Sequence, residues 1–377
     1  MNRLHLLEND HSRLPADFWS ARTGEVLVAA RWAEGRSEEV AWLHQRLPYL
    51  PCHVWFATSG TLARAGESKW VSLSKEALLA SAAAVNHHLE ARATDVWGLT
   101  LPLAHVGGLG VVARAHLLGQ KVLCLTPGRW EPARLHADRW DGHFLSLVPA
   151  QLHDLVSTRV TPPKGLRAVI LGGDRLDDEL ARRALAEGWP VRASYGLTEF
   201  ASQVATATDE HPLRPQPLTH VRLQVDEEDR LWIEGPSLFT GMARVAGAEL
   251  VYEARAAGPW RTGDRARVTE TGLEILGRAD GMVKVRGEKV DIPTLERQLS
   301  ARLGQAILVL ALPDVRDGHA LWWVSEAGLS AELVAQVRQE LLPHQRPRGT
   351  RVKVFPRTEL GKIKRMELQD ELARTSD

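Results

Sequence analysis

The segment Thr58-Ser59-Gly60-Thr61 combines hydroxyl groups with a glycine, and Lys69 follows it a few residues later. Hydroxyls, closely spaced backbone N–H groups and an ammonium are the donors that bind phosphate oxygens. A loop of this kind suits a triphosphate that must be gripped and then released. A polar hairpin turn between two strands explains the same residues equally well, so this segment alone leaves both interpretations open.

A second candidate is the run SYGLTE over 194–199, which follows a short predicted strand. Thr198 and Glu199 place a hydroxyl beside a carboxylate, and such a pair can serve a phosphate group and its Mg²⁺. The alternative is that the same two residues begin a helix as its N-terminal cap.

Two turns farther along the chain each carry a charged residue that could contact a nucleotide. WRTGD over 260–264 ends in Asp264, and an aspartate that accepts from both ribose hydroxyls is a common nucleoside contact. Near the C-terminus, Lys362 follows Gly361 on a turn from which a lysine can be swung into a site. Each has an ordinary alternative, a polar turn for the first and a solvated surface lysine for the second.

Two further patterns resemble nucleotide-binding motifs but lack an essential residue. GLGVVA over 108–113 fits the dinucleotide fingerprint, yet the next predicted strand runs into Pro-Gly at 127–128 without the acid that binds ribose. Close packing of a helix explains these glycines better. A Walker A loop is excluded because Glu67 follows Gly66 where a lysine is required.

These candidates need a scaffold, and residues 50–200 alternate between short β-branched or aromatic runs and longer Ala/Leu-rich segments of helical period. Strands alternating with helices predict a largely parallel α/β sheet. We expect helices over 75–91, capped by Ser74, and over 178–187, between Asp177 and Gly188. The predicted strands are His53–Thr58, Lys69–Leu73, Val96–Leu101, Lys121–Thr126, His143–Val148, Ala168–Leu171 and Val191–Ser194.

Beyond residue 205 the pattern changes twice. A proline-rich connection over 211–218 leads into a small antiparallel β unit that extends to 279. A small α+β unit follows, so we place a large N-terminal domain over 1–279 and a C-terminal domain over 280–377. The elements expected in these two parts are strands at 221–225 and 230–234, a strand pair around 283–290, a helix at 293–302, strands at 307–312 and 320–325, and a helix at 331–342.

Composition excludes several classes of protein. The 377 residues carry 47 Lys+Arg against 47 Asp+Glu, which excludes nucleic-acid binding through a bulk basic surface. No apolar run reaches the roughly 18–20 residues of a membrane span, and residues 1–13 lack the apolar segment of a secretory signal. Cys52 and Cys124 form neither a disulfide framework nor a zinc-binding pattern, so we expect a reducing, cytoplasmic setting.

Taken together, the candidate segments resemble the adenylate-forming superfamily, also called the acyl-CoA synthetase or AMP-binding superfamily. The resemblance runs from about Trp55 to Leu368 and rests on YGLTE at 195–199, WIEGPSLFTG at 232–241, TGD at 262–264, GRADGMVKVRGEKVD at 277–291 and GK at 361–362. Within the superfamily, the o-succinylbenzoate–CoA ligases of menaquinone biosynthesis are the most similar group. The segments that carry this are LTLPLAHVGGLG (99–110), SLVPAQLHDL (146–155), AVILGGDRL (168–176) and SYGLTEFASQV (194–204).

The resemblance implies a two-step reaction on a small carboxylic acid with Mg²⁺, ATP and coenzyme A. The carboxylate attacks the α-phosphorus of ATP and releases pyrophosphate, and the CoA thiolate then displaces AMP. It implies catalytic roles for His105 at the acyl pocket, Thr198 on phosphate, Glu199 as the Mg²⁺ ligand and Lys362 on the carboxylate and α-phosphate. The nucleotide contacts that it implies are Thr58, Ser59, Gly60, Thr61, Lys69, Gly172, Gly173, Ser194, Tyr195, Gly196, Asp264 and Arg278, with Lys284 and Gly287 for CoA.

By the same resemblance, Asp280 is the hinge of a mobile C-terminal domain. This domain would rotate after adenylation, so that Lys362 leaves and the strand pair around 284–289 faces the site. The sequence departs from the family pattern in two places. The segment ahead of the TSGT loop is much shorter, so we expect a reduced first subdomain, and Leu-Ala-Arg at 62–64 displaces Lys69, so that Arg64 can share the phosphate role.

The leading hypothesis is therefore an ATP-dependent ligase that makes 2-succinylbenzoyl-CoA from 2-succinylbenzoate. A CoA ligase for another aryl or acyl acid is one alternative, and a nucleotide-binding homologue that has lost catalysis is the other. Retained Glu199, Asp264 and Lys362 favour an enzyme, because a protein that only binds nucleotide needs no mobile lysine. Trp322 and Trp323 must point to opposite faces of one strand, so one of them is expected at a surface, which leaves a homodimer open.

Overall fold

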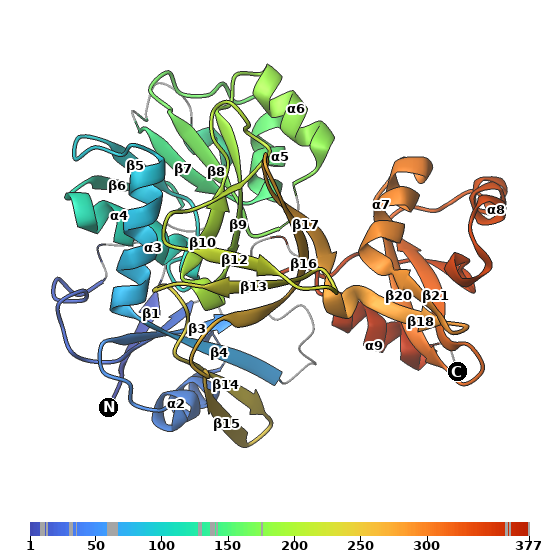
Figure 1. Cartoon of the computed structure of the whole chain (residues 1–377), viewed down its shortest axis with the longest axis horizontal. Coiled ribbons are helices and arrows are strands. Elements are labelled where there is room, and N and C mark those ends of the chain that lie inside the picture. Colours follow the sequence, from blue (N-terminus) through green and yellow to red (C-terminus); the bar gives the residue numbers. More distant parts are fainter. Residues whose placement is uncertain are drawn as a thin grey trace.

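The computed structural model shows a large body and, coloured orange to red, a smaller C-terminal lobe beside it (Figure 1). No helix in the described part of the chain is long and apolar enough to cross a membrane. The structure describes residues 1–7, 12, 14–29, 33–34, 36–58, 67–126, 130–135, 140, 142–174, 176–358, 361 and 363–375.

A seven-stranded sheet in the order β11-β10-β9-β8-β7-β5-β6 forms one half of the large body. Its strands β5 to β9 are parallel, as predicted, because α4 (Val106–Leu118), α5 (Pro149–Ser157) and α6 (Asp178–Ala186) connect successive strands. The strands are β5 (Val96–Leu99), β6 (Lys121–Cys124), β7 (Phe144–Leu147), β8 (Ala168–Leu171), β9 (Val191–Leu197), β10 (Ser202–Thr206) and β11 (Gln216–Pro217).

The end of β9 differs from the expectation in a way that shapes the site. The strand continues to Leu197 and turns back through a short 3₁₀ helix, Thr198–Phe200, into antiparallel β10. No side chain caps this turn and no α-helix begins there, so the N-cap alternative for Thr198 and Glu199 is wrong. Gly196 is required at the crossing because a Cβ on it would lie 1.7 Å from the carbonyl oxygen of Ser202.

A six-stranded sheet in the order β1-β2-β3-β4-β14-β15 forms the other half of the body. The strands β3 and β4 pair antiparallel, which agrees with the hairpin that was one of two interpretations of this segment. The strands β14 and β15 belong to this sheet, where β14 pairs with β4, and not to the small β unit expected from the sequence. They do so because Ala243 and Val245 pack into a core with Trp55 and Trp70. The bounds are β1 (Arg3–Leu7), β2 (Glu25–Ala29), α2 (Ser37–Arg46), β3 (His53–Thr58), β4 (Glu67–Ser74), β14 (Gly241–Ala246) and β15 (Glu249–Ala254).

Helix caps fall where the sequence placed them. Ser74 Oγ accepts from the backbone N–H of Ala77 at the start of α3 (Lys75–His88), and Asp177 caps α6 in the same way. Gly108 serves close packing of the helix, as expected, since a Cβ on it would lie 2.1 Å from the carbonyl oxygen of Pro102. Both features fix the helices against the sheet edge that carries the candidate residues.

The remaining strands form an antiparallel sheet, β12-β13-β16-β17, and the C-terminal lobe. In the lobe Trp323 is buried, whereas half-buried Trp322 lies under the Arg351 guanidinium of the same chain, 4.4 Å from its ring centroid. The division at 279/280 stays a prediction. The bounds are β12 (Arg222–Val225), β13 (Arg230–Glu234), β16 (Trp260–Thr269), β17 (Gly272–Arg278), β18 (Met282–Val285), β19 (Glu288–Asp291), α7 (Ile292–Leu303), β20 (Ile307–Asp314), β21 (Gly318–Ser325), α8 (Ala331–Glu340), β22 (Gly349–Val352) and α9 (Arg365–Thr375).

Candidate functional site

A cavity of about 680 Å³ opens where β7, β8 and β9 end, which is the edge at which parallel sheets bind ligands. Residues 172–174 after β8, together with Ser194 and residues 196–199 at the end of β9, form one wall. The ends of β4 and β14, together with Arg278 and Thr358, form the opposite side. Both halves of the large body and the C-terminal segment therefore contribute to one space.

Ten of the residues nominated from the sequence line this cavity. The lining does not include Tyr195, Asp264, Lys284 or Gly287. Four others, Ser59, Gly60, Thr61 and Lys362, lie outside the described residues, as does Arg64. The ten are Thr58, Lys69, His105, Gly172, Gly173, Ser194, Gly196, Thr198, Glu199 and Arg278.

Lys69 and Glu199 form an ion pair in the cavity. Lys69 Nζ donates to Glu199 Oε1 at 2.6 Å, and the two side chains come from opposite halves of the body. Within the described residues no group of three or more His, Cys, Asp or Glu side chains could hold a metal ion. Mg²⁺ is commonly held by one or two carboxylates plus substrate phosphates, and a single carboxylate that already accepts a cation fits that role.

Tyr195, Asp264 and Arg278 form a second polar group beside the cavity. The Tyr195 hydroxyl donates to Asp264 Oδ2 at 2.6 Å, while Nη1 of Arg278 lies 3.6 Å from Asp264 Oδ1. Burial and, after it, the Asp264 charge raise the pKa of Tyr195 well above its usual value, so its hydroxyl stays protonated and can donate. Gly263 allows this approach, because a Cβ there would lie 2.5 Å from the Arg278 guanidinium.

His105 ends the loop after β5 and is the N-cap residue of α4. Burial lowers its pKa below the ordinary value, because the charged imidazolium loses hydration there. The ring is therefore neutral near pH 7. It lines the cavity next to Gly107, and its role at an acyl pocket stays a prediction.

Arg114 lines the same cavity and was not singled out from the sequence. Its side chain on α4 is buried, it donates to Ser146 Oγ at 3.2 Å, and in the described part of the chain its Nε has no partner. Burial lowers its pKa to about 9, which still leaves the guanidinium charged at pH 7. The sequence signal that could have identified Arg114 is a single arginine in the otherwise small and apolar run 107–115.

The C-terminal segment reaches the cavity at the turn that precedes Lys362. Thr358 lines the cavity, and a Cβ on Gly361 would lie 3.1 Å from the Ala150 Cβ in α5. The β18–β19 hairpin lies elsewhere, since the carbonyl oxygen of Lys284 contacts His319 Nδ1 on β21 at 3.0 Å. The structure thus brings Thr358 to the cavity, and neither Lys284 nor Gly287 lines it.

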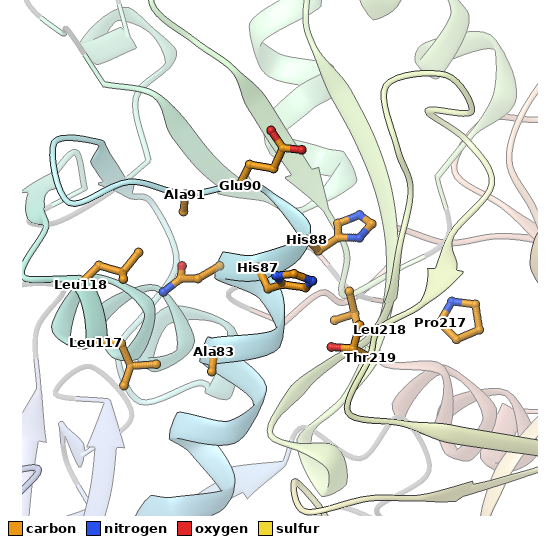
Figure 2. A pocket seen from close by; sticks show the side chains of 11 residues that line it. Ala83, His87, His88, Glu90, Ala91, Leu117, Leu118, Pro217, Leu218 and Thr219 are labelled. Carbon is orange, nitrogen blue, oxygen red and sulfur yellow. The ribbon is translucent and has the colours of Figure 1, made fainter.

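A second hollow, of about 710 Å³, lies between α3, α4 and residues 217–219 (Figure 2). Figure 2 shows His87 and His88 on its helical side, facing Leu218 and Thr219. His88 Nε2 already contacts the carbonyl oxygen of Ala207 at 3.0 Å. None of the nominated residues lines this hollow, so the smaller cavity is the candidate site.

Comparisons with known sequences agree with the motifs. The AMP-binding enzyme family matches residues 52–242. The chain is 31% identical over 317 residues to the 2-succinylbenzoate–CoA ligase of Salmonella typhimurium, covering 82% of this chain and 65% of that protein. The chain therefore spans slightly less than two thirds of that relative's length.

Comparisons with solved structures agree with the fold. Wild-type E. coli MenE with a bound m-phenylether-linked analogue of OSB-AMS has a TM-score of 0.66 at 26% identity, covering 85% of this chain and 69% of that chain. O-succinylbenzoate coenzyme A synthetase (MenE) from Bacillus subtilis in complex with AMP has a TM-score of 0.74 at 20% identity, covering 98% and 83%. These likenesses confirm the predicted α/β architecture with a large and a small domain.

Proposed function

Since this chain belongs to the AMP-binding enzyme family, as its motifs predicted, we propose that it is an ATP-dependent acid–CoA ligase. Its proposed reaction converts 2-succinylbenzoate to 2-succinylbenzoyl-CoA through an acyl-adenylate, which is a step of menaquinone biosynthesis in the cytoplasm. The similarity to a 2-succinylbenzoate–CoA ligase supports this choice, and the position of Arg114 carries it. A homodimer stays a prediction.

Arg114 supports a substrate with two carboxylates. In the part of the chain that the structure describes, this buried guanidinium has no acidic partner, which is costly unless a ligand supplies the anion. 2-Succinylbenzoate has one carboxylate to activate and a second that can pair with Arg114. Leu101, Gly107 and Ile170 line the same cavity and leave an apolar or open surface suited to an aromatic ring.

The first step brings two anions together, so the protein's task is to neutralise and align them. Thr58, Lys69 and Thr198, with the loop residues Ser59, Gly60 and Thr61, would hold the phosphates. Asp264 would bind the ribose hydroxyls, with Arg278 nearby, and Gly172, Gly173 and Tyr195 would border the adenine, beside Ser194 and Gly196. Lys362, carried in by the Gly361 turn, would contact both the substrate carboxylate and the α-phosphate.

Glu199 would hold Mg²⁺ together with phosphate oxygens. The ion, when bound, supplies positive charge to the phosphate oxygens of ATP. Lys69 must then leave its present position 2.6 Å from Glu199 Oε1, which would free its ammonium for phosphate. The ion pair thus keeps both groups compensated until the nucleotide arrives.

The second step requires CoA to reach the adenylate. Thr358 lines the cavity, whereas Lys284 and Gly287 of the β18–β19 hairpin do not, so the present arrangement suits adenylation. Rotation about Asp280 would exchange the lysine turn for the hairpin and bring Lys284 and Gly287 to the CoA path. The thiolate would then attack the acyl carbonyl and release AMP.

The test is pyrophosphate release from Mg-ATP with CoA and a panel of acids. The panel contains 2-succinylbenzoate, benzoate, succinate and a medium-chain fatty acid. A response confined to 2-succinylbenzoate supports the proposal, whereas a response to other acids alone keeps the ligase chemistry and rejects the substrate. ATP binding without release for any acid would favour the homologue that has lost catalysis.

A further inference from the structure

Arg244 lies directly opposite Lys69 in the ladder between β14 and β4. Directly paired residues of antiparallel strands project from the same face, with Cβ atoms about 4.5–5.5 Å apart. Ala243 and Val245 point to the other face, where they pack with Trp70. Arg244 and Lys69 therefore share one face, and both line the cavity.

Two like charges placed opposite each other are unfavourable unless an anion compensates them. In this structure each cation has its own carboxylate. Lys69 contacts Glu199 at 2.6 Å, but Arg244 contacts Glu253 at 3.6 Å, with the two side chains 63% and 58% exposed. An exposed pair of this kind contributes little, so Arg244 can exchange Glu253 for a stronger anion at small cost.

We propose that Arg244 is a second phosphate-binding residue, which together with Lys69 binds the β- and γ-phosphates of ATP and the pyrophosphate formed from them. This inference rests on the proposed function. A guanidinium binds phosphate through two parallel N–H donors, which a lysine cannot offer. As the carboxylate oxygen bonds to the α-phosphorus, the bond to the bridging oxygen breaks and its electron pair leaves on pyrophosphate, where Arg244 stabilises the added charge.

The position of Arg244 could also compensate for the altered position of Lys69 in the phosphate loop. By the resemblance to the adenylate-forming superfamily, Leu-Ala-Arg at 62–64 is expected to displace Lys69 along the chain. A cation on the neighbouring strand, held by the β4–β14 ladder, supplies charge from a rigid element instead of from the loop. Strand-borne groups are positioned more accurately than loop-borne ones, which suits a leaving group whose charge develops at one place.

The experiment measures binding of inorganic pyrophosphate, Mg-ATP and AMP to the full chain by calorimetry. The variants are Arg244→Ala, Arg244→Lys and, as a matched control, Arg267→Ala. Arg267 is an exposed arginine on β16 that does not line the cavity. Arg244→Ala should weaken pyrophosphate and Mg-ATP about tenfold or more and leave AMP unchanged, because AMP lacks the β- and γ-phosphates. Arg244→Lys should recover part of the loss.

The contrary outcomes are distinct. Equal weakening of AMP and Mg-ATP in Arg244→Ala would indicate a structural effect and overturn the inference. Unchanged pyrophosphate binding, or an equal loss in Arg267→Ala, would also overturn it. Glu253→Gln provides a second variant, in which pyrophosphate binding should be kept or tightened because Arg244 loses its competing carboxylate. Failure of the proposed function looks different, since the wild-type chain would then bind Mg-ATP and release no pyrophosphate with any acid.

Discussion

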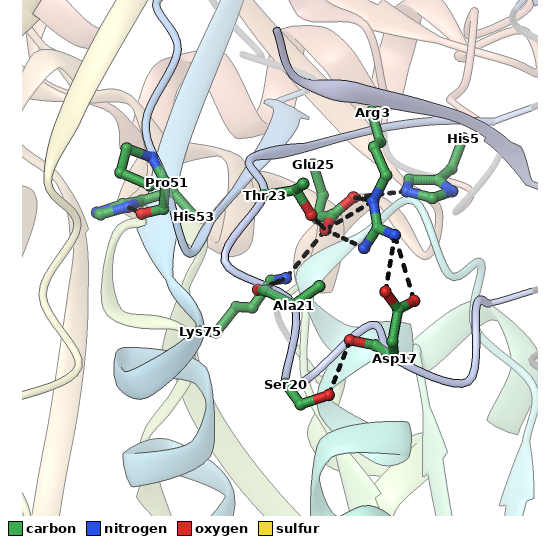
Figure 3. Close-up of polar contacts among 10 residues, drawn as sticks. All are labelled: Arg3, His5, Asp17, Ser20, Ala21, Thr23, Glu25, Pro51, His53 and Lys75. Atoms are coloured by element: carbon green, nitrogen blue, oxygen red, sulfur yellow. Dashed lines mark hydrogen bonds and ion pairs between the residues drawn. The ribbon is translucent and has the colours of Figure 1, made fainter.

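Two groups of charged side chains are buried in this molecule, and their partners differ. At the start of the chain, Glu25 is fully buried and accepts from Arg3 and His5 at 2.7 Å and from Lys75 at 2.9 Å (Figure 3). In the cavity, Arg114 is also buried, but in the described part of the chain it donates only to the Ser146 hydroxyl, lies over the Trp97 ring and has no partner for its Nε. Figure 3 shows the first group closed around one carboxylate. Arg114, by contrast, lines a cavity that can admit a ligand.

The difference separates two uses of buried charge. The network around Glu25 joins β1, β2 and α3. Removing the Glu25 carboxylate therefore takes the shared acceptor away from several buried donors at once. A buried charge that faces a cavity, such as that of Arg114, does not stabilise the fold and can instead bind an anionic ligand. We therefore expect substitutions in the Glu25 network to change stability and leave binding intact, and substitutions in the cavity to do the reverse.

The largest effect on stability should come from Glu25→Ala. Removing this carboxylate takes away the buried acceptor that Arg3, His5 and Lys75 share, and we expect a loss of about 3–5 kcal/mol in the free energy of unfolding. Urea denaturation followed by fluorescence measures it. Asp17→Ala is the control, because Asp17 pairs with Arg3 at 3.2 Å while 59% exposed and should cost less than about 1 kcal/mol. Equal losses in the two variants would contradict the idea of a closed network.

Glu25 also sets a pH window. Burial alone would raise its pKa, but hydrogen bonds from His5, Arg3, Lys75 and Thr23 outweigh burial and hold the pKa well below its usual range. A lowered carboxyl pKa contributes stability above its ordinary value near 4.5, and this contribution is lost as the pH falls below that value. Wild-type stability should therefore fall more steeply below about pH 4.5 than that of Glu25→Ala.

The largest effect on chemistry should come from Lys362→Ala. Thr358, four residues earlier in the chain, lines the cavity, and the proposed mechanism needs the Lys362 ammonium as charge develops on the carboxylate and α-phosphate. We expect acid-dependent pyrophosphate release to fall about a hundredfold to a thousandfold with an unchanged melting temperature. Lys364→Ala is the control, since Lys364 pairs at the surface with Glu367 at 3.3 Å. Wild-type adenylation by Lys362→Ala would remove Lys362 from the mechanism.

Arg114→Met tests whether the buried arginine at the cavity serves binding and not stability. Removing an unpaired buried charge should leave the melting temperature unchanged or raise it, because methionine fills similar space without a desolvation cost. The KM for 2-succinylbenzoate should rise about tenfold to a hundredfold, with the KM for ATP unchanged. Steady-state pyrophosphate release measures both. A destabilised variant with normal KM values would place Arg114 with the structural charges.

The sequence predicted elements whose signal is local and missed features that depend on distant contacts. The β3 and β8 strands have the expected bounds because each is a short β-branched or aromatic run between clear breaks. The pairing of β14 with β4 joins residues far apart in the chain, which periodicity cannot reveal. Arg114 and Arg244 were missed for the same reason, since burial and cross-strand position are tertiary properties. The cavity, by contrast, contains most of the motif residues, because motifs at strand ends converge on one edge.

His220 offers a third case, a buried polar ring that belongs to neither group. Both ring nitrogens are buried without a partner in the described part of the chain, and the ring packs on Phe200 with centroids 5.2 Å apart. Burial lowers its pKa to about 4 from 6.5, so between these values the unfolded chain binds a proton that the folded chain does not. Stability should therefore fall as the pH drops through this window, and level off below it as far as His220 is concerned.

The expected size of the His220 effect is about 1 kcal/mol between pH 7 and pH 5, once partial solvent screening is allowed for. His220→Phe should remove that part of the pH dependence while keeping the contact with Phe200. Urea midpoints at the two pH values measure it, and the Glu25 network does not interfere because its loss begins at lower pH. An unpartnered polar group outside the cavity would then only destabilise the fold. An unchanged pH profile in His220→Phe would mean that the ring finds a partner in solution, and that missing partners alone do not distinguish a binding site from ordinary structure.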